Sequence, residues 1–506
     1  MKLKVKKLFM DAGDLYVVVL NSKTLKKYAL HPLDRIDIIK GKSRLTCIIN
    51  VGDKIVKENE IGVYLEVYKK MKLRDGESVE IELQEQPKSL MYIREKIQGK
   101  TLDYKKIYEI VKDTVNRDLT ESEISAFLTA LEIHKITMEE NEYLSRAMIE
   151  TGNKINWGKK RIFDKHSLGG IPGKKESLLI VPIVAAAGLT IPKTSSRAVS
   201  SASGTADTME SIANVEFTLD EIKRIVKKHG GCIVWGGSVD LSPADDIFIQ
   251  VEHPLEIDPM FLPSIMSKKK SVGSTDVVID IPMGREAKVK TISSAHTLAR
   301  EFIELGRRLS MRVRCAITYG EQPIGHAIGP ALEAREALET LMGNGPNSLI
   351  QKAIGLSSII FDMAGKKKPM KLAEYILKSG KAEKKFREIV GAQGGDPKLK
   401  PKDIHIGEKK FDVISKKSGT VFWIRNFQLT ELARTLGAPK DKGAGIYLYK
   451  KKGYKVKKGE KLFTMFSESE AKLDNALEKL KKMEPVVVRE RISQEIIMDV
   501  IKEVKR

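Results

Sequence analysis

The sequence predicts a multidomain protein of combined α+β and α/β class. It has four expected parts: an N-terminal small β domain, an all-α lobe, an α/β lobe with a mixed sheet, and a C-terminal α+β module. The chain of 506 residues is too long for a single hydrophobic core. The spacing of its apolar residues also changes along the chain, from a period of two to a helical period and back. Length and periodicity together therefore divide the chain into these four parts.

The first part, residues 1–84, has the pattern of a small β domain. Runs such as Tyr16–Leu20, Thr46–Asn50 and Val79–Leu83 alternate β-branched and polar residues. Turn signals such as Asp75-Gly76 separate the runs, so we expect short strands that close into a barrel. Pro87 marks the boundary with the next part.

The second part, residues 88–158, has the spacing of helices. Ile107, Ile110 and Val111 share one helical face. Thr120 and Thr137 are each followed three positions later by a glutamate, which is the capping-box signature of a helix start. We expect an all-α lobe here, completed by residues of about 215–265.

The remaining two parts combine strands and helices in different ways. Over residues 159–390, short apolar runs such as Gly231–Trp235 and Asp276–Asp280 alternate with glycine loops and helical stretches, as in an α/β lobe. Over residues 400–490 the pattern is again β, with runs such as Ile446–Tyr449. A final helix, about residues 470–482, makes this an α+β module.

Bulk composition excludes several classes of protein. No run of about eighteen apolar residues exists, and the N-terminus lacks the apolar core of a secretion signal. Three cysteines without a CxxC pair argue against a disulfide scaffold or a structural zinc site. We therefore expect a cytoplasmic protein with buried free thiols and no membrane partner.

The chain carries a formal net charge of +22, which favours polyanionic partners. The lysines are scattered in short runs, and only 6% of residues are aromatic, which is few for stacking on nucleic acid. We expect small phosphorylated ligands rather than a specific nucleic acid. A solvated charged surface explains the same excess equally well.

Two loops have the residues of a phosphate site. The first, Asp164–Ser177, offers a lysine, two serines and a Gly-Gly pair before a helix, whose N-terminal N–H groups attract anions. The second, Ser195–Thr205, offers several hydroxyls, Arg197 and a glycine before another helix. Each alone could be a surface turn or a serine-rich linker. Together they fit two strand–loop–helix units that face one anion.

These loops resemble the hallmark motifs of the thymidine/pyrimidine-nucleoside phosphorylase family, close to D-K-H-S-x-G-G, S-x-R and G-T-x-D-x-x-E-S. Here the motifs are Asp164–Gly170, Ser195–Arg197 and Gly204–Ser211. Gln322–Gly325 and Ile328–Glu333 add shared stretches, and the resemblance covers about residues 88–490. The additional N-terminal β domain resembles the archaeal AMP phosphorylase branch.

The resemblance implies the residues of the site. Phosphate would be bound by Lys165, Ser167, Ser177, Ser195 and Thr205. The nucleotide would be bound by Gly170, Ser196, Arg197, Ala198, Val199, Ser200, Ser201, Thr205, Ser264 and Lys288. Asp258 would donate a proton to the departing base, with Glu256 as the fallback, and this requires burial that raises the pKa of the acid.

Two departures from the pyrimidine enzymes favour a nucleoside 5′-monophosphate as the substrate. No arginine lies between Gln250 and Ser264, where those enzymes have one to read the base. Lys288 stands where they have an aromatic residue, and a cation there suits another base or an additional phosphate.

The resemblance thus implies a pentosyltransferase that converts AMP and phosphate to adenine and ribose 1,5-bisphosphate, with CMP and UMP as further candidate substrates. Pyrimidine-nucleoside (thymidine) phosphorylase is the alternative; a phosphoribosyltransferase and a nucleic-acid-binding protein are more distant ones. We expect no cofactor, no metal site, and a homo-oligomer built from dimers. The α lobe and the α/β lobe would form opposite walls of a cleft that closes on the substrates.

Overall fold

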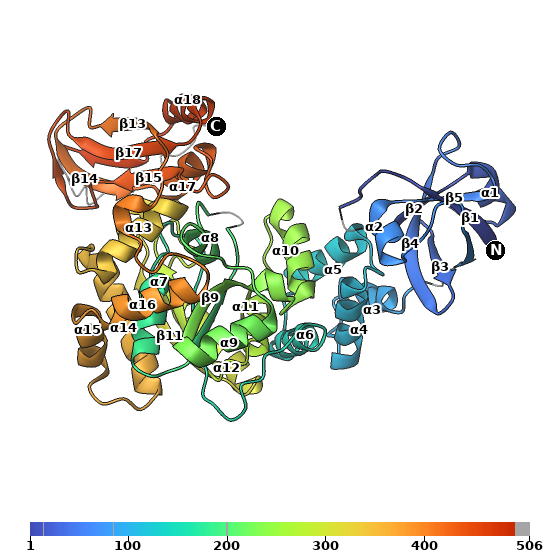
Figure 1. Ribbon diagram of the computed structural model, residues 1–506, viewed down its shortest axis with the longest axis horizontal. Helices are drawn as coiled ribbons and strands as arrows, with labels where there is room; N and C mark the ends of the chain where they lie inside the picture. The colour runs from blue at the N-terminus through green and yellow to red at the C-terminus, as the bar shows by residue number, and fades with distance from the viewer. Residues whose placement is uncertain (14, 84–85, 199–200, 491–506) are drawn as a thin grey trace, which may run out of the picture. The chain divides into compact units, whose positions relative to one another are not determined.

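The computed structural model describes residues 1–13, 15–83, 86–198 and 201–490 (Figure 1). The chain divides into two compact units. Of the described residues, unit 1 holds Met1–Thr151 and Pro243–Ser264, and unit 2 holds Gly152–Ser242 and residues 265–490. Of the range 215–265 that we expected to complete the helical lobe, only Pro243–Ser264 does so, because the preceding residues form a helix and a strand of unit 2.

The N-terminal part of unit 1 is a closed six-stranded barrel, as the sequence predicts. Its strand order is β1-β5-β2-β4-β3-β6, and β1 closes the barrel by pairing with both β5 and β6. Alternate residues such as Ile36, Ile38 and Ile81 are buried in its core. The elements are β1 (Lys2–Lys7), β2 (Val17–Leu20), α1 (Ser22–Lys27), β3 (Arg35–Lys40), β4 (Ser43–Val51), β5 (Glu60–Val63), α2 (Leu65–Lys70) and β6 (Ser78–Leu83).

The rest of unit 1 is helical. It contains α3 (Ser89–Ile97), α4 (Tyr104–Val115), α5 (Glu121–His134), α6 (Met138–Glu150) and α10 (Pro243–Leu255). Both predicted capping boxes are present, at the starts of α5 and α6. The helices pack around Phe127, Leu128 and Phe248, which are at most 1% exposed.

Unit 2 is built on parallel strands: β7 (Phe163–Ser167), β8 (Ile191–Ser195), β9 (Gly231–Trp235), β10 (Asp276–Met283) and β11 (Arg312–Tyr319). Three pair in the order β11-β10-β7 and two as β8-β9, and a parallel bridge between Ile162 and Thr190 links the two sets. Every pairing among these strands is parallel, whereas we expected a mixed sheet. Helices cover the strands, which explains the continuous apolar run at Val277–Ile279.

The helices of this lobe include the very apolar α7, in which nine residues are buried. The full set is α7 (Ser177–Ala186), α8 (Thr205–Glu210), α9 (Leu219–His229), η1 (Gly236–Val239), α11 (Phe261–Ser271), α12 (Ile292–Arg308), α13 (Pro330–Leu341), α14 (Asn347–Met363), α15 (Pro369–Lys378), α16 (Lys381–Ala392) and η2 (Pro401–Asp403). Of these, α11 begins in unit 1 and ends in unit 2.

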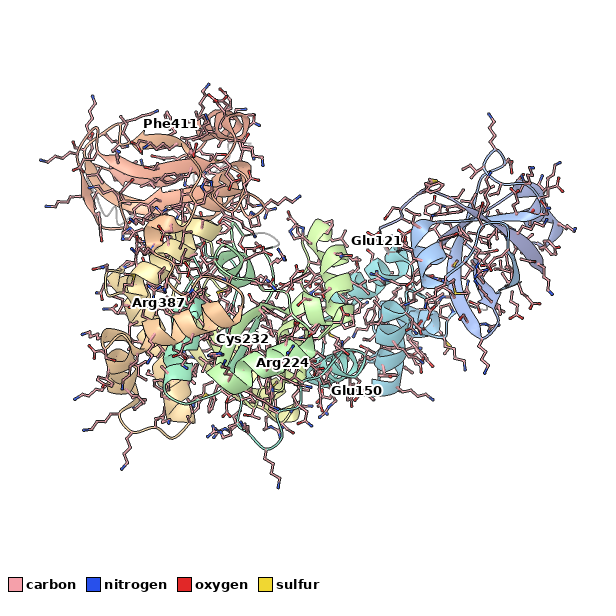
Figure 2. All side chains as sticks on the ribbon, in the orientation of Figure 1. Glu121, Glu150, Arg224, Cys232, Arg387 and Phe411 are labelled. Atoms are coloured by element: carbon pink, nitrogen blue, oxygen red, sulfur yellow. The ribbon has the colours of Figure 1, made fainter. Side chains whose placement is uncertain are left out.

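The C-terminal module has two antiparallel sheets, in the orders β12-β15-β17-β13 and β16-β14-β18. Figure 1 shows α17 and α18 beside the larger sheet, whose edge strand β13 carries the half-exposed Phe411 labelled in Figure 2. The elements are β12 (Ala327–Ile328), β13 (Lys409–Ile414), β14 (Gly419–Ile424), α17 (Asn426–Thr435), β15 (Gly445–Leu448), β16 (Lys455–Val456), β17 (Lys461–Ser467), α18 (Glu470–Leu480) and β18 (Val486–Arg489).

The three cysteines are free thiols, as expected. Cys47 is buried in the barrel, Cys232 is buried on β9 (Figure 2), and Cys315 is half-buried. Burial raises the pKa of the Cys232 and Cys315 thiols to about 12, so neither is a reactive thiolate at neutral pH. Among the described residues, no helix is both long and apolar enough to cross a membrane.

Candidate functional site

The two predicted phosphate loops leave the sheet of unit 2 at the same edge. Ser167 and Ser195 each stand five positions after the residues that bridge their strands, Ile162 and Thr190. On the other side of β7, Ser167 is in register with Asp280 of β10. Because these strands are parallel, their carboxyl ends and the loops that follow them share one edge.

The ammonium of Lys269 holds this edge together. Its Nζ lies 2.8 Å from Oδ2 of Asp164 on β7 and 3.5 Å from the carbonyl oxygen of Thr194 on β8. These two residues precede Lys165 and Ser195, the first predicted ligand of each loop. The contact therefore fixes the spacing between the two loops.

A buried carboxylate lies among the residues of the first loop. Lys165 Nζ donates to Oε1 of Glu176 at 2.6 Å, and Ser167 Oγ donates to the same oxygen at 2.8 Å. The side chains of Lys165 and Glu176 are 2% and 0% exposed. Ser177, the next predicted ligand, is buried and is the first residue of α7. The structure thus brings Lys165 and Ser167 together at Glu176, the residue that precedes Ser177.

A second ion pair extends this cluster across β10 to α14. Lys352 Nζ lies 2.7 Å from Oδ2 of Asp280, and Thr318 Oγ1 donates to Oδ1 of Asp280 at 2.5 Å. Ser167 Oγ also lies within hydrogen-bond distance of Asp280, so its single hydrogen is shared between the two carboxylates. Two lysines and two carboxylates therefore form one buried cluster, which we call the anion cluster: Lys165, Lys352, Glu176 and Asp280.

Glu176 is ionised in this cluster. Burial alone would raise its pKa, but the neighbouring Lys165 and Lys352 hold the pKa well below its ordinary value. Its Oε1 accepts the two bonds described above, whereas its buried Oε2 has no hydrogen-bond partner among the residues that the structure describes. Its side chain makes no capping bond to α7.

Lys288 and Gly170 also lie together. Gly170 has a φ of +96°, and a Cβ there would lie 2.9 Å from the backbone nitrogen of Lys288, so a glycine is required. A Cβ at the preceding Gly169 would contact the Lys288 side chain at 3.6 Å. Lys288 itself is exposed, so its side chain is accessible to a ligand at this loop.

The second loop is held by Asp207. Its Oδ2 accepts from the backbone N–H groups of Ala198, at 2.7 Å, and Gly204, at 2.9 Å. Gly204 is the N-cap of α8, and Thr205 is the first residue of that helix. The loop therefore folds back so that Ser196 and Ala198 lie beside the start of α8.

Arg197 pairs with acidic side chains of the protein. Its guanidinium makes two hydrogen bonds of 2.7 Å to Glu210 and one of 2.7 Å to Glu216. It also lies over the ring of Trp235. The expected contact of Arg197 with the nucleotide stays a prediction, and in this structure its side chain supports the loop through these two glutamates. Val199 and Ser200, two other expected nucleotide residues, lie outside the described residues.

The C-terminal module supports the second loop. Lys442 Nζ lies 2.5 Å from Oε2 of Glu210 and 3.5 Å from Oδ1 of Asp207. Arg434 donates to the carbonyl oxygen of Ser201 at 3.2 Å, and the Ser201 hydroxyl donates to the Ser203 carbonyl oxygen. The module is therefore part of the scaffold of the loop.

Gly204→Ala is expected to lower the free energy of unfolding by about 1–3 kcal/mol. A Cβ at this position would lie 2.7 Å from the carbonyl oxygen of Ser196 and 3.0 Å from the backbone nitrogen of Ala198, so the loop must shift. Denaturant unfolding of the full chain measures the change. Gly355→Ala, in α14 with no atom near the added Cβ, is the control and is expected to cause no loss.

The predicted acid and one nucleotide residue lie in unit 1. Asp258 and its fallback Glu256 follow α10, and Ser264 lies in the first half of α11. Asp258 and Glu256 are exposed, and Ser264 is half-buried. The burial that we expected around Asp258 is therefore not present, because the residue lies in a surface turn between two helices.

Sequence reasoning missed Glu176, Asp280 and Lys352. Glu176 stands inside the first loop, next to Ser177, and the available signal was an acidic residue directly after two lysines. No sequence signal pointed to Lys352, because its partner Asp280 is distant in the sequence. Within the described ranges, no group of three histidine, cysteine or acidic side chains is placed to hold a metal ion.

Family models match three parts of the chain. A model described as "Glycosyl transferase family, helical bundle domain" matches residues 91–152, and "Glycosyl transferase family, a/b domain" matches residues 159–383. "Pyrimidine nucleoside phosphorylase C-terminal domain" matches residues 420–486. The matched ranges correspond to the helical lobe, the α/β lobe and the C-terminal module.

Curated relatives match over nearly the whole chain. The AMP phosphorylase of Thermococcus kodakarensis is 49% identical over 502 residues, covering 98% of this chain and 99% of the relative. That of Pyrococcus furiosus is 48% identical with the same coverage, and that of Thermofilum pendens is 45% identical over 99% of this chain and 97% of the relative.

A solved structure shares the fold. The anthranilate phosphoribosyltransferase of Thermus thermophilus has a TM-score of 0.52 and 19% identity, over 60% of this chain and 99% of that one. At this identity the likeness shows the fold alone.

Proposed function

Because the chain belongs to the archaeal AMP phosphorylase branch of the thymidine/pyrimidine-nucleoside phosphorylase family, we propose that it cleaves AMP with inorganic phosphate. The products are adenine and ribose 1,5-bisphosphate. The observation that supports the proposal is the shared edge of β7 and β8, where Lys165 and Ser167 both contact Glu176, the residue before Ser177. CMP and UMP are proposed as further substrates of the same site.

In this proposal the first loop binds phosphate and aims one oxygen at C1′ of the ribose. The bond from that oxygen to C1′ forms as the bond from C1′ to the base breaks. Lys165 supplies a cation, and the hydroxyls of Ser167, Ser177, Ser195 and Thr205 supply donors. The positive end of the α7 dipole adds a further attraction for an anion at this loop.

The nucleotide is proposed to occupy the edge beside this phosphate. Gly170 permits close approach of the backbone, and Lys288 beside it supplies a cation for the 5′-phosphate. Ser196, Ala198 and Ser201 of the second loop are further candidates for binding, together with Val199, Ser200 and Ser264. For Arg197 the structure favours a supporting role, because its guanidinium is engaged by Glu210 and Glu216.

The departing base takes up negative charge, so a proton donor assists the reaction. We propose Asp258 for this role. Burial of this acid in the complex with substrates would exclude water and so suppress hydrolysis. The same burial would raise the pKa of the acid, as a proton donor requires.

Incubating the full chain with AMP and phosphate is expected to release adenine in step with ribose 1,5-bisphosphate, without a cofactor. Chromatography of the bases and phosphate analysis of the sugar measure both products. Adenosine and thymidine, each with phosphate, are the comparison substrates. Turnover of thymidine but not of AMP would contradict the proposal and favour a pyrimidine-nucleoside phosphorylase.

The same assay addresses the other classes of enzyme. A strict requirement for Mg²⁺ and pyrophosphate chemistry would favour a phosphoribosyltransferase, whose fold the α/β lobe shares. We further propose a cytoplasmic homo-oligomer built from dimers, with small nucleotides and phosphate rather than nucleic acid as partners. Light scattering of the purified chain measures the assembly.

A further inference from the structure

The anion cluster contains a carboxylate where a phosphate site would be expected to hold only donors. Glu176 accepts hydrogen bonds from Lys165 and Ser167 and is adjacent in sequence to Ser177. These are three of the five residues proposed to bind phosphate. An anion bound by them would therefore lie against the Glu176 carboxylate.

The free oxygen of this carboxylate needs a donor. Oε2 of Glu176 is buried and has no hydrogen-bond partner in the described part of the chain, and leaving a buried acceptor unsatisfied is costly. The carboxylate is ionised, so Oε2 can accept a hydrogen bond but cannot donate one. A ligand that satisfies it must bring its own hydroxyl hydrogen.

Charge alone does not decide which anion this site prefers, because it acts alike on anions of equal charge. The two lysines of the cluster are each paired with a carboxylate, Lys165 with Glu176 and Lys352 with Asp280. An incoming oxyanion without a hydrogen would place a lone pair against Oε2, whereas one with a hydroxyl group would form a charge-assisted hydrogen bond there.

From these contacts we infer that Glu176 is a specificity-determining residue, which makes the site select oxyanions that carry a hydroxyl hydrogen, such as phosphate, over equally charged oxyanions that lack one, such as sulfate. In the bound state the phosphate P–OH donates to Oε2 of Glu176, while Lys165 and Ser167 bind its other oxygens. The inference rests on the proposed phosphate site.

Competition between anions tests the inference on the unaltered protein. Calorimetric titration of the full chain with phosphate, sulfate and monofluorophosphate compares three tetrahedral anions, the last two being dianions without a hydroxyl hydrogen at neutral pH. We expect phosphate to bind about 10–100-fold more tightly than either of the other anions, because one hydrogen bond to a charged group changes affinity by about this factor. Equal binding of phosphate and monofluorophosphate would overturn the inference without any variant.

Substitution then attributes the preference to one side chain. Glu176→Gln offers an amide N–H to any oxyanion. The ratio of the sulfate affinity to the phosphate affinity is therefore expected to rise by about tenfold or more in this variant. The readout is the ratio of the two affinities, because a change in net charge acts on both anions alike. Asp280→Asn removes the same charge from the same cluster and is the matched control, with an unchanged ratio expected. An unchanged ratio in Glu176→Gln would overturn the assignment.

The two proposals fail in different ways. If the protein binds phosphate in preference to sulfate but releases no adenine from AMP, the proposed reaction is wrong and the inference stands. If it cleaves AMP with phosphate while sulfate competes on equal terms, the reaction stands and the role of Glu176 is wrong.

Discussion

Asp258→Asn is expected to lower kcat for AMP phosphorolysis by about 10²–10⁴-fold, the usual contribution of a positioned proton donor. Asparagine has nearly the same size and cannot supply the proton, so the KM for AMP should change little. Because Asp258 is exposed in a turn of unit 1, the free energy of unfolding should also stay close to that of the unaltered protein. Steady-state kinetics with saturating phosphate measure the effect.

Two further measurements separate loss of the acid from loss of the site. A nucleotide methylated at N7 of the purine carries a positive base that leaves without a proton, so Asp258→Asn should cleave it almost as fast as the unaltered protein does. Glu256→Gln tests the fallback acid, which lies two residues away in a strained, positive-φ conformation. Full activity of Asp258→Asn together with loss in Glu256→Gln would transfer the role to Glu256.

Lys165→Met is expected to have two large effects. The loss of a cation among the phosphate donors should lower kcat/KM for phosphate by about 10²-fold. The same change leaves Glu176 buried without its ion-pair partner, which typically costs about 3–5 kcal/mol of the free energy of unfolding. Kinetics and denaturant unfolding measure the two effects separately.

A double variant distinguishes the catalytic contribution of Lys165 from its structural one. In Lys165→Met with Glu176→Gln, the unpaired buried charge is gone, so most of the stability should return. The rate with phosphate should stay low, because the cation is still absent. Recovery of activity along with stability would mean that Lys165 acts only by supporting the fold.

The architecture was predictable where local pattern decides structure. The barrel and the capped helices follow from alternation and from the Thr-x-x-Glu signatures, which act over a few residues. The segment that completes the helical lobe was expected at about residues 215–265, whereas only Pro243–Ser264 belongs to unit 1. Helical spacing does not say which neighbour a helix packs against, so these bounds could not be predicted closely. The parallel pairing was also open, since apolar runs alone do not give strand direction.

The site was predictable as loops but not as a network. The hydroxyls, glycines and lysine of the two motifs are close in sequence to the helix starts that they precede. The hydrogen bond from Ser167 to Asp280 joins residues 113 apart, and the ion pair from Lys352 depends on the packing of α14 against β10. The ion pairs of Arg197 with Glu210 and Glu216 could likewise be seen only in the folded loop. In the sequence, an arginine in a serine-rich stretch is equally consistent with binding a ligand.

The support of the second loop by the C-terminal module has a consequence for how the protein is made. Arg434 holds a carbonyl oxygen 233 residues earlier in the chain, and Lys442 neutralises the carboxylates that anchor the same loop. Chains fold from the N-terminus as they leave the ribosome, at about 5–20 residues per second. The second loop thus leaves the ribosome many seconds before Arg434 and Lys442 do. A ribosome-bound chain that ends before residue 434 is therefore expected to form the sheet of unit 2 while the second loop still lacks these two contacts.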